Sequence, residues 1–285
     1  MNYLFLNLKR FDIPPQYGGV NRIAPIQEWG RYVIAKTQKR LMPYCKDGIF
    51  VQFFPEAHLL SAAEELCENS PVALGCQGVH RVDTAIGGNF GALTTHFPAS
   101  AAAALGCRWA MIGHYEERKD KADILAHAAP APAEAVNRIL NQEIQAAAKR
   151  GLKILYCIGE TEQEQSCWKE TLAVQLKQGL QEIDLKQVCI AYEPVWAIGP
   201  GKLPPDQSYI QMVVKYIKEY TGGVPVVYGG GLKADNAESI AAIPEVDGGL
   251  IALTRFGGEI GFYPDEYIAI VEKYLARRKN EAAPI

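Results

Sequence analysis

The chain has 285 residues, with 29 Lys and Arg against 32 Asp and Glu, which gives a formal net charge of −3. This near balance, with no long run of basic residues, argues against nucleic acid or an anionic membrane as the main partner. No apolar stretch approaches the roughly 20 residues that a membrane-spanning helix needs. The N-terminal segment has neither the basic start nor the small-residue cleavage site of a signal peptide. The seven cysteines are odd in number, scattered and without a CxxC pair, which favours reduced thiols and a cytoplasmic location.

Short, nearly continuous apolar runs recur along the chain, as expected of parallel strands that are covered on both faces. Eight such runs are present: Tyr3–Leu8, Ile49–Phe54, Val72–Gln77, Trp109–Gly113, Lys153–Ile158, Val188–Tyr192, Val224–Tyr228 and Gly248–Leu253. Between and after them lie segments with apolar residues at helical spacing: 26–42, 58–68, 99–105, 132–150, 160–182, 206–220, 234–243 and 264–278. Eight strand–helix units in a chain of this length predict a closed (β/α)8 barrel rather than an open sheet.

The chain shows no linker and no break in composition, so residues 1–285 are expected to form a single domain. Two segments are long for their place, Phe11–Ala24 and Arg118–Glu134, and both are expected to be elaborated loops at one mouth of the barrel. The polar stretch Arg277–Ile285 is expected to form a frayed C-terminal tail.

Three polar residues follow different predicted strands on the side where such barrels carry their catalytic groups. Lys9 follows the first strand, His114 the fourth and Glu193 the sixth. Taken singly, a lysine after a strand is usually solvated, a lone histidine is more often packed, and a glutamate before proline often anchors a loop. The convergence of all three on one mouth favours a shared catalytic role.

Several segments of the chain resemble the triosephosphate isomerase family. AYEPVWAIGPGK at 191–202 is very similar to the family's catalytic-base and lid segment, and MIGHYEER at 111–118 resembles its electrophile segment, usually written with GHSERR. Four further matches follow in the family's order at compatible spacings: Asn7-x-Lys9, LYCIGE at 155–160, YGGG at 228–231 and VDGGLI at 246–251. The resemblance covers nearly the whole chain and implies a single (β/α)8 TIM barrel.

The resemblance implies an aldose–ketose isomerase that interconverts glyceraldehyde 3-phosphate and dihydroxyacetone phosphate, with no cofactor and no metal. Glu193 would be the base that removes a proton next to the carbonyl, and His114 would polarise the substrate oxygens. Lys9 would offset the charge of the substrate and of the enediolate intermediate, since preorganised charges stabilise a buried anion. Asn7 would assist as a donor, and Glu116 would hold the Lys9 ammonium in place.

The resemblance also implies a lid and a subunit interface. Pro194–Lys202 would be the lid, in which Gly199 lets the backbone come close to a phosphate. The third loop, Gly87–Thr95, would protrude into a neighbouring subunit, so a homodimer is expected. Cys157 ends the fifth strand, where the family usually has cysteine, and is expected to pack rather than to act as a nucleophile.

Four departures from the family pattern lie near the expected substrate. Tyr115 replaces a serine beside His114, and its bulk could crowd or reorient Glu193. Glu117 replaces one arginine of the usual pair. Gly231 replaces a serine, so it keeps the backbone N–H and loses the hydroxyl.

The loop after the eighth strand departs the most. The family's LVGGASL is here LIALTRF at 250–256, so Ala252 and Leu253 stand where glycines let the backbone approach a phosphate. Arg255 is either a replacement grip for the phosphate, because a guanidinium binds such groups bidentately, or an ordinary surface or interface residue. The proton-transfer residues are therefore kept while the anion site is rewritten. A tetrulose phosphate or another small sugar phosphate is the alternative substrate, and a catalytically silent barrel with a binding role is less favoured.

The remaining candidates carry less weight. Four histidines have no metal-ligand spacing and are expected to be ordinary loop or surface residues: His58, His80, His96 and His127. The glycine-rich Gly87–Gly91 lacks the Lys-Ser/Thr of a phosphate-binding P-loop, and no GxSxG nucleophile elbow is present.

Overall fold

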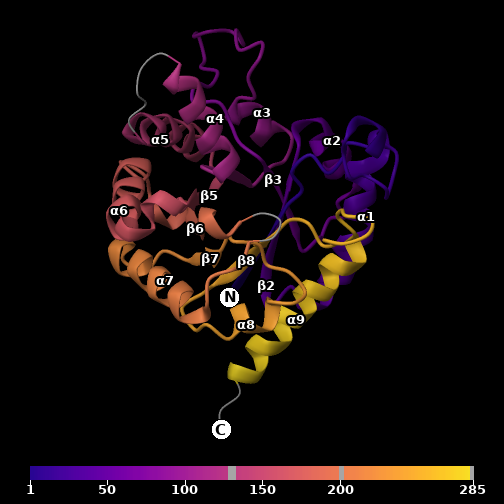
Figure 1. Cartoon of the computed structure of the whole chain (residues 1–285). Helices are drawn as coiled ribbons and strands as arrows, with labels where there is room; N and C mark the ends of the chain where they lie inside the picture. The colour runs from indigo at the N-terminus through magenta and orange to yellow at the C-terminus, as the bar shows by residue number, and fades with distance from the viewer. Residues whose placement is uncertain (128–132, 199–201, 283–285) are drawn as a thin grey trace.

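The computed structural model describes residues 1–127, 133–198 and 202–282. Eight parallel strands form a closed barrel in chain order (Figure 1), which confirms the predicted fold. The strands are β1 (Asn2–Asn7), β2 (Gly48–Phe54), β3 (Val72–Cys76), β4 (Trp109–Ile112), β5 (Lys153–Ile158), β6 (Val188–Tyr192), β7 (Val226–Tyr228) and β8 (Gly248–Ile251). The barrel closes where β1 pairs with β8, with Tyr3 opposite Gly248.

Side chains alternate between two apolar layers along each strand, because successive residues of a strand point to opposite faces. In β1, Phe5 belongs to the inner cluster that fills the barrel, whereas Leu4 and Leu6 belong to the outer cluster under the helices. In β6, Ala191 points inward and Tyr192 outward in the same way. The nearly continuous apolar runs of the sequence follow from this coverage on both faces.

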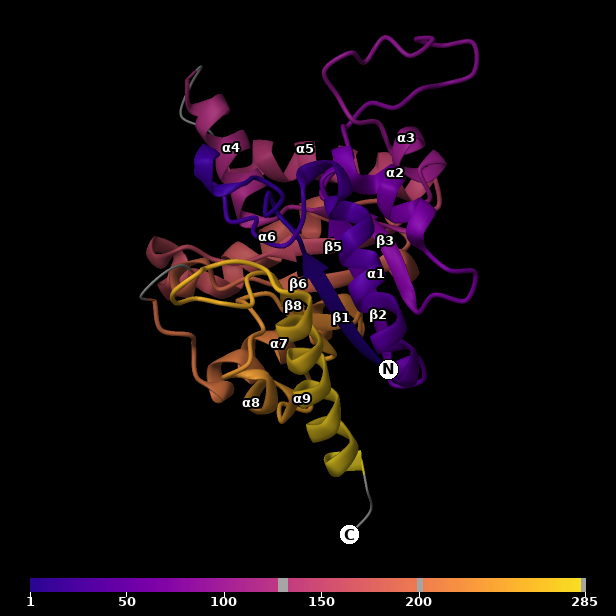
Figure 2. The same cartoon turned by 90° about the vertical axis from the view of Figure 1, so that its right-hand side faces the viewer.

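Helices surround the barrel (Figures 1 and 2). They are α1 (Trp29–Leu41), α2 (Glu56–Glu65), α3 (Ala99–Ala104), α4 (Tyr115–Ala126), α5 (Ala133–Lys149), α6 (Trp168–Gly179), α7 (Gln207–Thr221), α8 (Ala237–Ala241) and α9 (Pro264–Ala282). Helix α6 begins later than the spacing predicts, since a 3-10 segment over Glu162–Cys167 precedes it. Helix α9 continues to Ala282, so residues 277–282 are helical and not the frayed tail that was expected. None of the described helices is long and apolar enough to cross a membrane.

Helix α4 corrects the expectation that Arg118–Glu134 is an irregular loop. Its residues fold as a helix up to Ala126, while residues 128–132 of that segment lie outside the described part of the chain. The helix buries none of its residues fully, so it has no apolar stripe that periodicity could detect. Its start is fixed instead by His114, which caps it, and by Glu116 and Glu117 in the first turn.

The first long loop, Phe11–Ala24, is irregular as expected and is held by a buried carboxylate. Asp12 is fully buried, accepts two hydrogen bonds from Arg10 at 3.0 and 2.8 Å, and lies 3.0 Å from His58 Nε2. His58 is therefore a buried partner in α2, 4 % exposed, and not the loop or surface residue that was expected. Burial opposes ionisation of Asp12, but hydrogen bonds from Arg10 and His58 outweigh it, so the pKa of Asp12 is lowered.

The segment between β3 and α3 projects from the barrel body as a long arm (Figures 1 and 2). Its apolar side chains Ile86 and Phe90 are exposed, and the latter has a positive φ of 52°. At the base of the arm the rings of His80 and His96 stack with centroids 3.7 Å apart.

Candidate active site

The barrel brings the expected polar residues to one mouth by simple alternation. Asn7 lies two residues beyond the inward-facing Phe5, and Glu193 lies two residues beyond the inward-facing Ala191. Both are therefore directed to the inside at the carboxyl ends of their strands. Both are also buried, with only 2 % of each residue exposed.

His114 occupies the N-cap of α4, and this position fixes its protonation. Its Nδ1 accepts a hydrogen bond from the Glu116 backbone N–H at 3.2 Å. An amide N–H can only donate, so Nδ1 carries no proton and the neutral ring carries its proton on Nε2. That Nε2 lies 3.8 Å from Oε1 of Glu193. A neutral imidazole donor and a carboxylate thus face each other across the mouth.

Glu193 is held on its other side by a backbone group. The Tyr115 N–H donates to Glu193 Oε2 at 3.0 Å. Glycines leave room for this residue: a Cβ on Gly159 would lie 1.7 Å from the Glu193 carbonyl oxygen, and one on Gly229 would lie 2.8 Å from its Cγ. A larger residue at either glycine would therefore displace Glu193 from its place next to His114.

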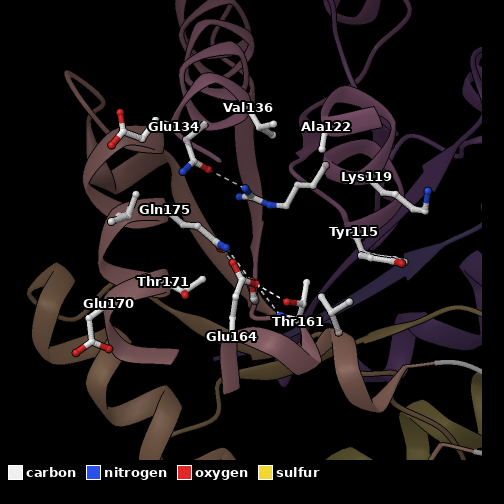
Figure 3. A pocket seen from close by; sticks show the side chains of 15 residues that line it. Tyr115, Lys119, Ala122, Glu134, Val136, Thr161, Glu164, Glu170, Thr171 and Gln175 are labelled. Atoms are coloured by element: carbon white, nitrogen blue, oxygen red, sulfur yellow. Dashed lines mark hydrogen bonds between the residues drawn. The ribbon is translucent and has the colours of Figure 1, made fainter. Parts of the chain in front are cut away.

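The Tyr115 side chain lines a cavity of about 680 Å³ that is bordered by residues of α4, α5 and α6 (Figure 3). Its contact with Glu193 is made through the backbone N–H, the same group that a serine would offer there. The substitution thus keeps the group that holds the carboxylate.

Lys9 is placed by a strained backbone and by three polar neighbours. Its φ of 39° is uncommon for a residue with a side chain, and Asn7 Oδ1 accepts its N–H at 3.0 Å. Gln77 Nε2 donates to its carbonyl oxygen at 2.9 Å. Its ammonium donates to Glu116 Oε1 at 2.6 Å. Burial opposes ionisation of Glu116, but Lys9 outweighs it and lowers the pKa of this carboxyl, so the pair stays charged.

Cys157 is fully buried inside the barrel, in the same inner layer as Ala191. Burial raises the pKa of its thiol well above the usual value, and the neighbouring charge of Glu193 adds to the effect. A thiol that resists ionisation is a poor nucleophile, which fits the expected packing role.

The first hinge of the lid is anchored by Glu160, which the sequence did not single out as a site residue. Its Oε1 accepts hydrogen bonds from the Trp196 indole N–H at 2.7 Å, the Tyr192 hydroxyl at 2.9 Å and the Tyr209 hydroxyl at 3.2 Å. Burial raises the pKa of Glu160. Residues 199–201 of the expected lid, Gly199 among them, lie outside the described residues.

The loops after β7 and β8 form the side of the mouth where a phosphate was expected. Gly231 has a φ of 95°, which favours glycine, although a Cβ there would meet open space. Ala252 and Leu253 are half-buried at the start of the β8 loop. No helix lies between β8 and α9 among the described residues, so this loop does not offer the short extra helix that often binds phosphate in such barrels.

Arg255 is paired with a residue of the first turn of α9 and stacked on a ring of its own loop. Its Nε and Nη2 donate to Glu266 Oε1 at 2.7 and 2.5 Å, and its guanidinium stacks over the Tyr263 ring at 3.8 Å. Arg255 also pairs through its backbone with Gly261, which closes the loop as a short antiparallel bridge. A grip on a phosphate would require this ion pair to open.

No group of three or more side chains that could hold a metal ion is present in the described parts of the chain. Near the carboxyl mouth of the (β/α)8 barrel the structure places a buried carboxylate 3.8 Å from an imidazole, and an ammonium that is paired with Glu116. Such a set of side chains is typical of enzymes that transfer protons.

Comparisons with known proteins then identify the family. The family model described as triosephosphate isomerase matches residues 30–259. The triosephosphate isomerase of Chlamydia muridarum is 30 % identical over 266 residues, which cover 86 % of this chain and 90 % of the relative. That of Chlorobium luteolum is 34 % identical over 218 residues, covering 73 % of this chain and 78 % of the relative. The chain belongs to the triosephosphate isomerase family and is an isomerase.

A solved structure shows the same fold. The crystal structure of triosephosphate isomerase from Bartonella henselae superposes with a TM-score of 0.70 at 21 % sequence identity. The match covers 96 % of this chain and 98 % of the other. The barrel, the helices and their order are therefore shared along nearly the whole length.

Proposed function

We propose that this enzyme interconverts glyceraldehyde 3-phosphate and dihydroxyacetone phosphate by proton transfer through an enediolate. The observation that carries the proposal is the pairing of His114 Nε2, which bears the proton, with the buried Glu193 carboxylate 3.8 Å away. Lys9 completes the set as a cation held at the same mouth by Glu116. The chain would act as one barrel domain over residues 1–285.

Each group has one task in this reaction. The Glu193 carboxylate takes the proton from the carbon next to the carbonyl. The electron pair of that C–H bond forms the C=C bond, and the pair of the C=O π bond moves to the oxygen to give the enediolate. His114 Nε2–H donates to the substrate oxygens, while the Lys9 ammonium offsets the anionic charge. The Asn7 side chain supports Lys9 by accepting a hydrogen bond from the Lys9 backbone N–H. Return of the proton from Glu193 to the neighbouring carbon, together with transfer of the hydroxyl proton to the enediolate oxygen by way of His114, completes the isomerisation.

The two oxygens of Glu193 have different neighbours. The Tyr115 N–H holds Oε2 at 3.0 Å, which leaves Oε1, the oxygen that faces His114, to act as the base. Closure of the lid on the Trp196 side, next to the Glu160 anchor, would exclude water and strengthen the interactions of the base.

The anion side favours a second candidate substrate. The β8 loop carries Ala252 and Leu253, and its arginine is paired with Glu266, so the phosphate contacts differ from the family pattern. The same isomerisation of another small sugar phosphate, such as a tetrulose phosphate, is the alternative.

We also propose a cytoplasmic homodimer that needs no cofactor. The projecting arm supports docking on a second copy of the chain. Phe90 lies within Gly87–Thr95 and Ile86 directly precedes it, and both are exposed apolar side chains of the kind that mark contact surfaces. The seven free cysteines of the described residues support a reducing compartment.

A coupled assay of the purified protein on glyceraldehyde 3-phosphate, tetrulose 4-phosphates and unphosphorylated sugars tests the proposal. The proposal is supported if the wild type turns over the triose phosphate and Glu193→Gln does not. Glu219→Gln, at an exposed position on α7, is the matched control and should keep the activity. Fast turnover of the tetrulose phosphate alone would favour the alternative. No turnover of any substrate by the wild type would make this a silent barrel and overturn the proposal.

A further inference from the structure

A partly buried cluster of two acids and one lysine contacts the turn that carries His114. Glu117 Oε2 accepts the Gly113 N–H at 2.6 Å, and Lys121 Nζ lies 2.9 Å from Glu117 Oε1. The same ammonium lies 3.0 Å from Glu143 Oε1 on α5. These three residues, Glu117, Lys121 and Glu143, are called the acid cluster below.

Gly113 is the single residue between the end of β4 and His114, and both of its peptide groups are fixed by side chains of α4. Glu117 holds its N–H, and Arg118 Nε donates to its carbonyl oxygen at 2.8 Å. Its φ is 84°, and a Cβ there would lie 2.7 Å from the Cys157 carbonyl oxygen. The orientation of the His114 ring therefore depends on two contacts made by the first turn of its own helix.

We propose that Glu117 is a positioning residue for His114, and that Lys121, which also contacts Glu143, holds the Glu117 carboxylate against the Gly113 N–H. The proposal rests on the function proposed for His114 above. It explains why an acid stands at 117, where the family pattern has an arginine: only an acceptor can bind a backbone N–H.

The charges of the acid cluster require one bound proton. Glu143 is 5 % exposed, and its Oε2 has no hydrogen-bond partner among the described residues. Burial raises the pKa of Glu143 to about 9, and the neighbouring charge of Glu117 adds to the rise while Lys121 opposes it. A proton on Glu143 therefore leaves one fewer charge in this partly buried cluster at neutral pH.

The other titratable groups that face the cluster come from two neighbouring elements. His80, at the base of the projecting arm, lies within electrostatic reach of Lys121. Tyr156 and Cys157 of β5 lie within reach of Glu117, and burial raises the pKa of both, so they stay neutral where Glu143 titrates. Arg118, on α4 itself, donates hydrogen bonds to Gly113, Cys157 and Asn137.

The experiment combines steady-state kinetics with a readout that needs no turnover. Glu117→Ala should lower kcat for the triose phosphate by about 10- to 100-fold, the range expected when a catalytic group is misplaced by an ångström, and leave KM within about twofold. Glu117→Gln, which keeps an acceptor, should rescue most of the loss. Asp123→Asn on the exposed face of α4 is the matched control, since its pairing with Lys119 has the same i, i+4 spacing as Glu117 and Lys121.

The NMR signals of the His114 ring nitrogens give the second readout in wild type and variants. We expect these signals to shift in Glu117→Ala and to stay unchanged in Glu117→Gln and Asp123→Asn. The shift can be measured even if the wild type turns over no triose phosphate. Absence of wild-type activity would thus refute the proposed function alone. Unchanged His114 signals and kcat in a folded Glu117→Ala protein, or equal losses in the Asp123→Asn control, would overturn the positioning role.

The pH dependence of kcat and of the His114 signals tests whether the proton on Glu143 matters or whether Glu143 only packs against the other two residues. Loss of its proton above about pH 9 adds a second buried carboxylate to the cluster and weakens the hold on Gly113. The His114 signals and kcat should therefore change near that pH in the wild type and not in Glu143→Gln, which stays neutral. The same alkaline change in both proteins would contradict the assignment of that proton to Glu143.

Discussion

The two sides of the barrel mouth differ in how closely they follow the triosephosphate isomerase pattern. On the β1, β4 and β6 side, Lys9, His114 and Glu193 are each held by at least one short polar contact. On the β7 and β8 side, the loop after β8 is closed by its own antiparallel bridge, and Arg255 is bound to Glu266. The side proposed to move the proton keeps Lys9, His114 and Glu193 and departs from the family pattern at Tyr115 and Glu117, whereas the loop expected to bind the anion departs from that pattern more strongly.

The difference fits the proposed function if separate loops of one scaffold carry the chemistry and the choice of substrate. A proton-transfer site needs several groups within hydrogen-bond distance of each other, so a change in one of them disables the reaction. Anion binding can be supplied by any backbone N–H or cation at the right place, so loops on that side can change more freely. Substitutions on the two sides should therefore act on different kinetic constants.

The largest effect is expected on the β1, β4 and β6 side, at the base. Glu193→Gln removes the proton acceptor and should lower kcat by about 10²- to 10⁴-fold, the usual contribution of a general base. KM should change little, because the amide keeps the size of the carboxyl. Steady-state kinetics with the triose phosphate measures both constants. A Glu193→Gln variant that retained wild-type kcat would contradict the role of Glu193 as the base.

The second largest effect is expected at the cation of the same side. Lys9→Met removes the charge that faces the enediolate and should lower kcat/KM by about 10²- to 10³-fold. Lys36→Met on α1, where the ammonium lies over the exposed side of the Tyr32 ring, serves as the control and should leave kcat/KM unchanged. A loss confined to KM would instead assign Lys9 to ground-state binding.

A smaller effect, on stability, is expected in the loop that follows Lys9. The pKa of Asp12 is lowered in the folded state, so its ionised form stabilises the fold above the unfolded value near 4, and this contribution is lost as the pH falls through the folded value. Asp12→Asn should lower the Tm at pH 7 and flatten the fall of Tm on acidification. Asp120→Asn, exposed on α4, should show neither change. Identical acid profiles for Asp12→Asn and wild type would contradict this role.

The smallest effect is expected at the arginine of the β7 and β8 side. Because Arg255 is tied to Glu266 and stacked on Tyr263, Arg255→Ala should lower Tm slightly and change KM for a phosphorylated sugar by less than about twofold. A rise of KM by tenfold or more, with unphosphorylated sugars unaffected, would show that the ion pair opens to bind the anion. That result would sharpen the comparison by placing the anion site in the β8 loop.

Much of the fold was predictable because buried parallel strands are apolar on both faces. The run Lys153–Ile158 coincides with β5, and the run Val188–Tyr192 coincides with β6. Helix α4 was missed because it buries no residue fully and is fixed by its cap at His114. Periodicity reports only burial, so a helix that is held by polar contacts at its first turn leaves no signal in it.

Within the site, the motifs predicted which residues meet but not what holds them. The contact of Lys9 with Glu116 was expected and is present at 2.6 Å. The contact of Glu117 with the Gly113 N–H depends on the backbone direction at a glycine with positive φ, and the contact of Lys121 with Glu143 depends on the packing of two helices. Neither is encoded in a local pattern. The capping interaction of His114 could have been found from its place before the acidic residues 116–117.

The most direct test follows deuterium from solvent into the substrate. Dihydroxyacetone phosphate is incubated with enzyme in D2O, and NMR records the exchange at the carbon that Glu193 is proposed to deprotonate. Proton transfer by Glu193 predicts rapid exchange by the wild type and a rate at least about 100-fold lower in Glu193→Gln. Exchange no faster than in buffer alone, or equal rates in the two proteins, would contradict it.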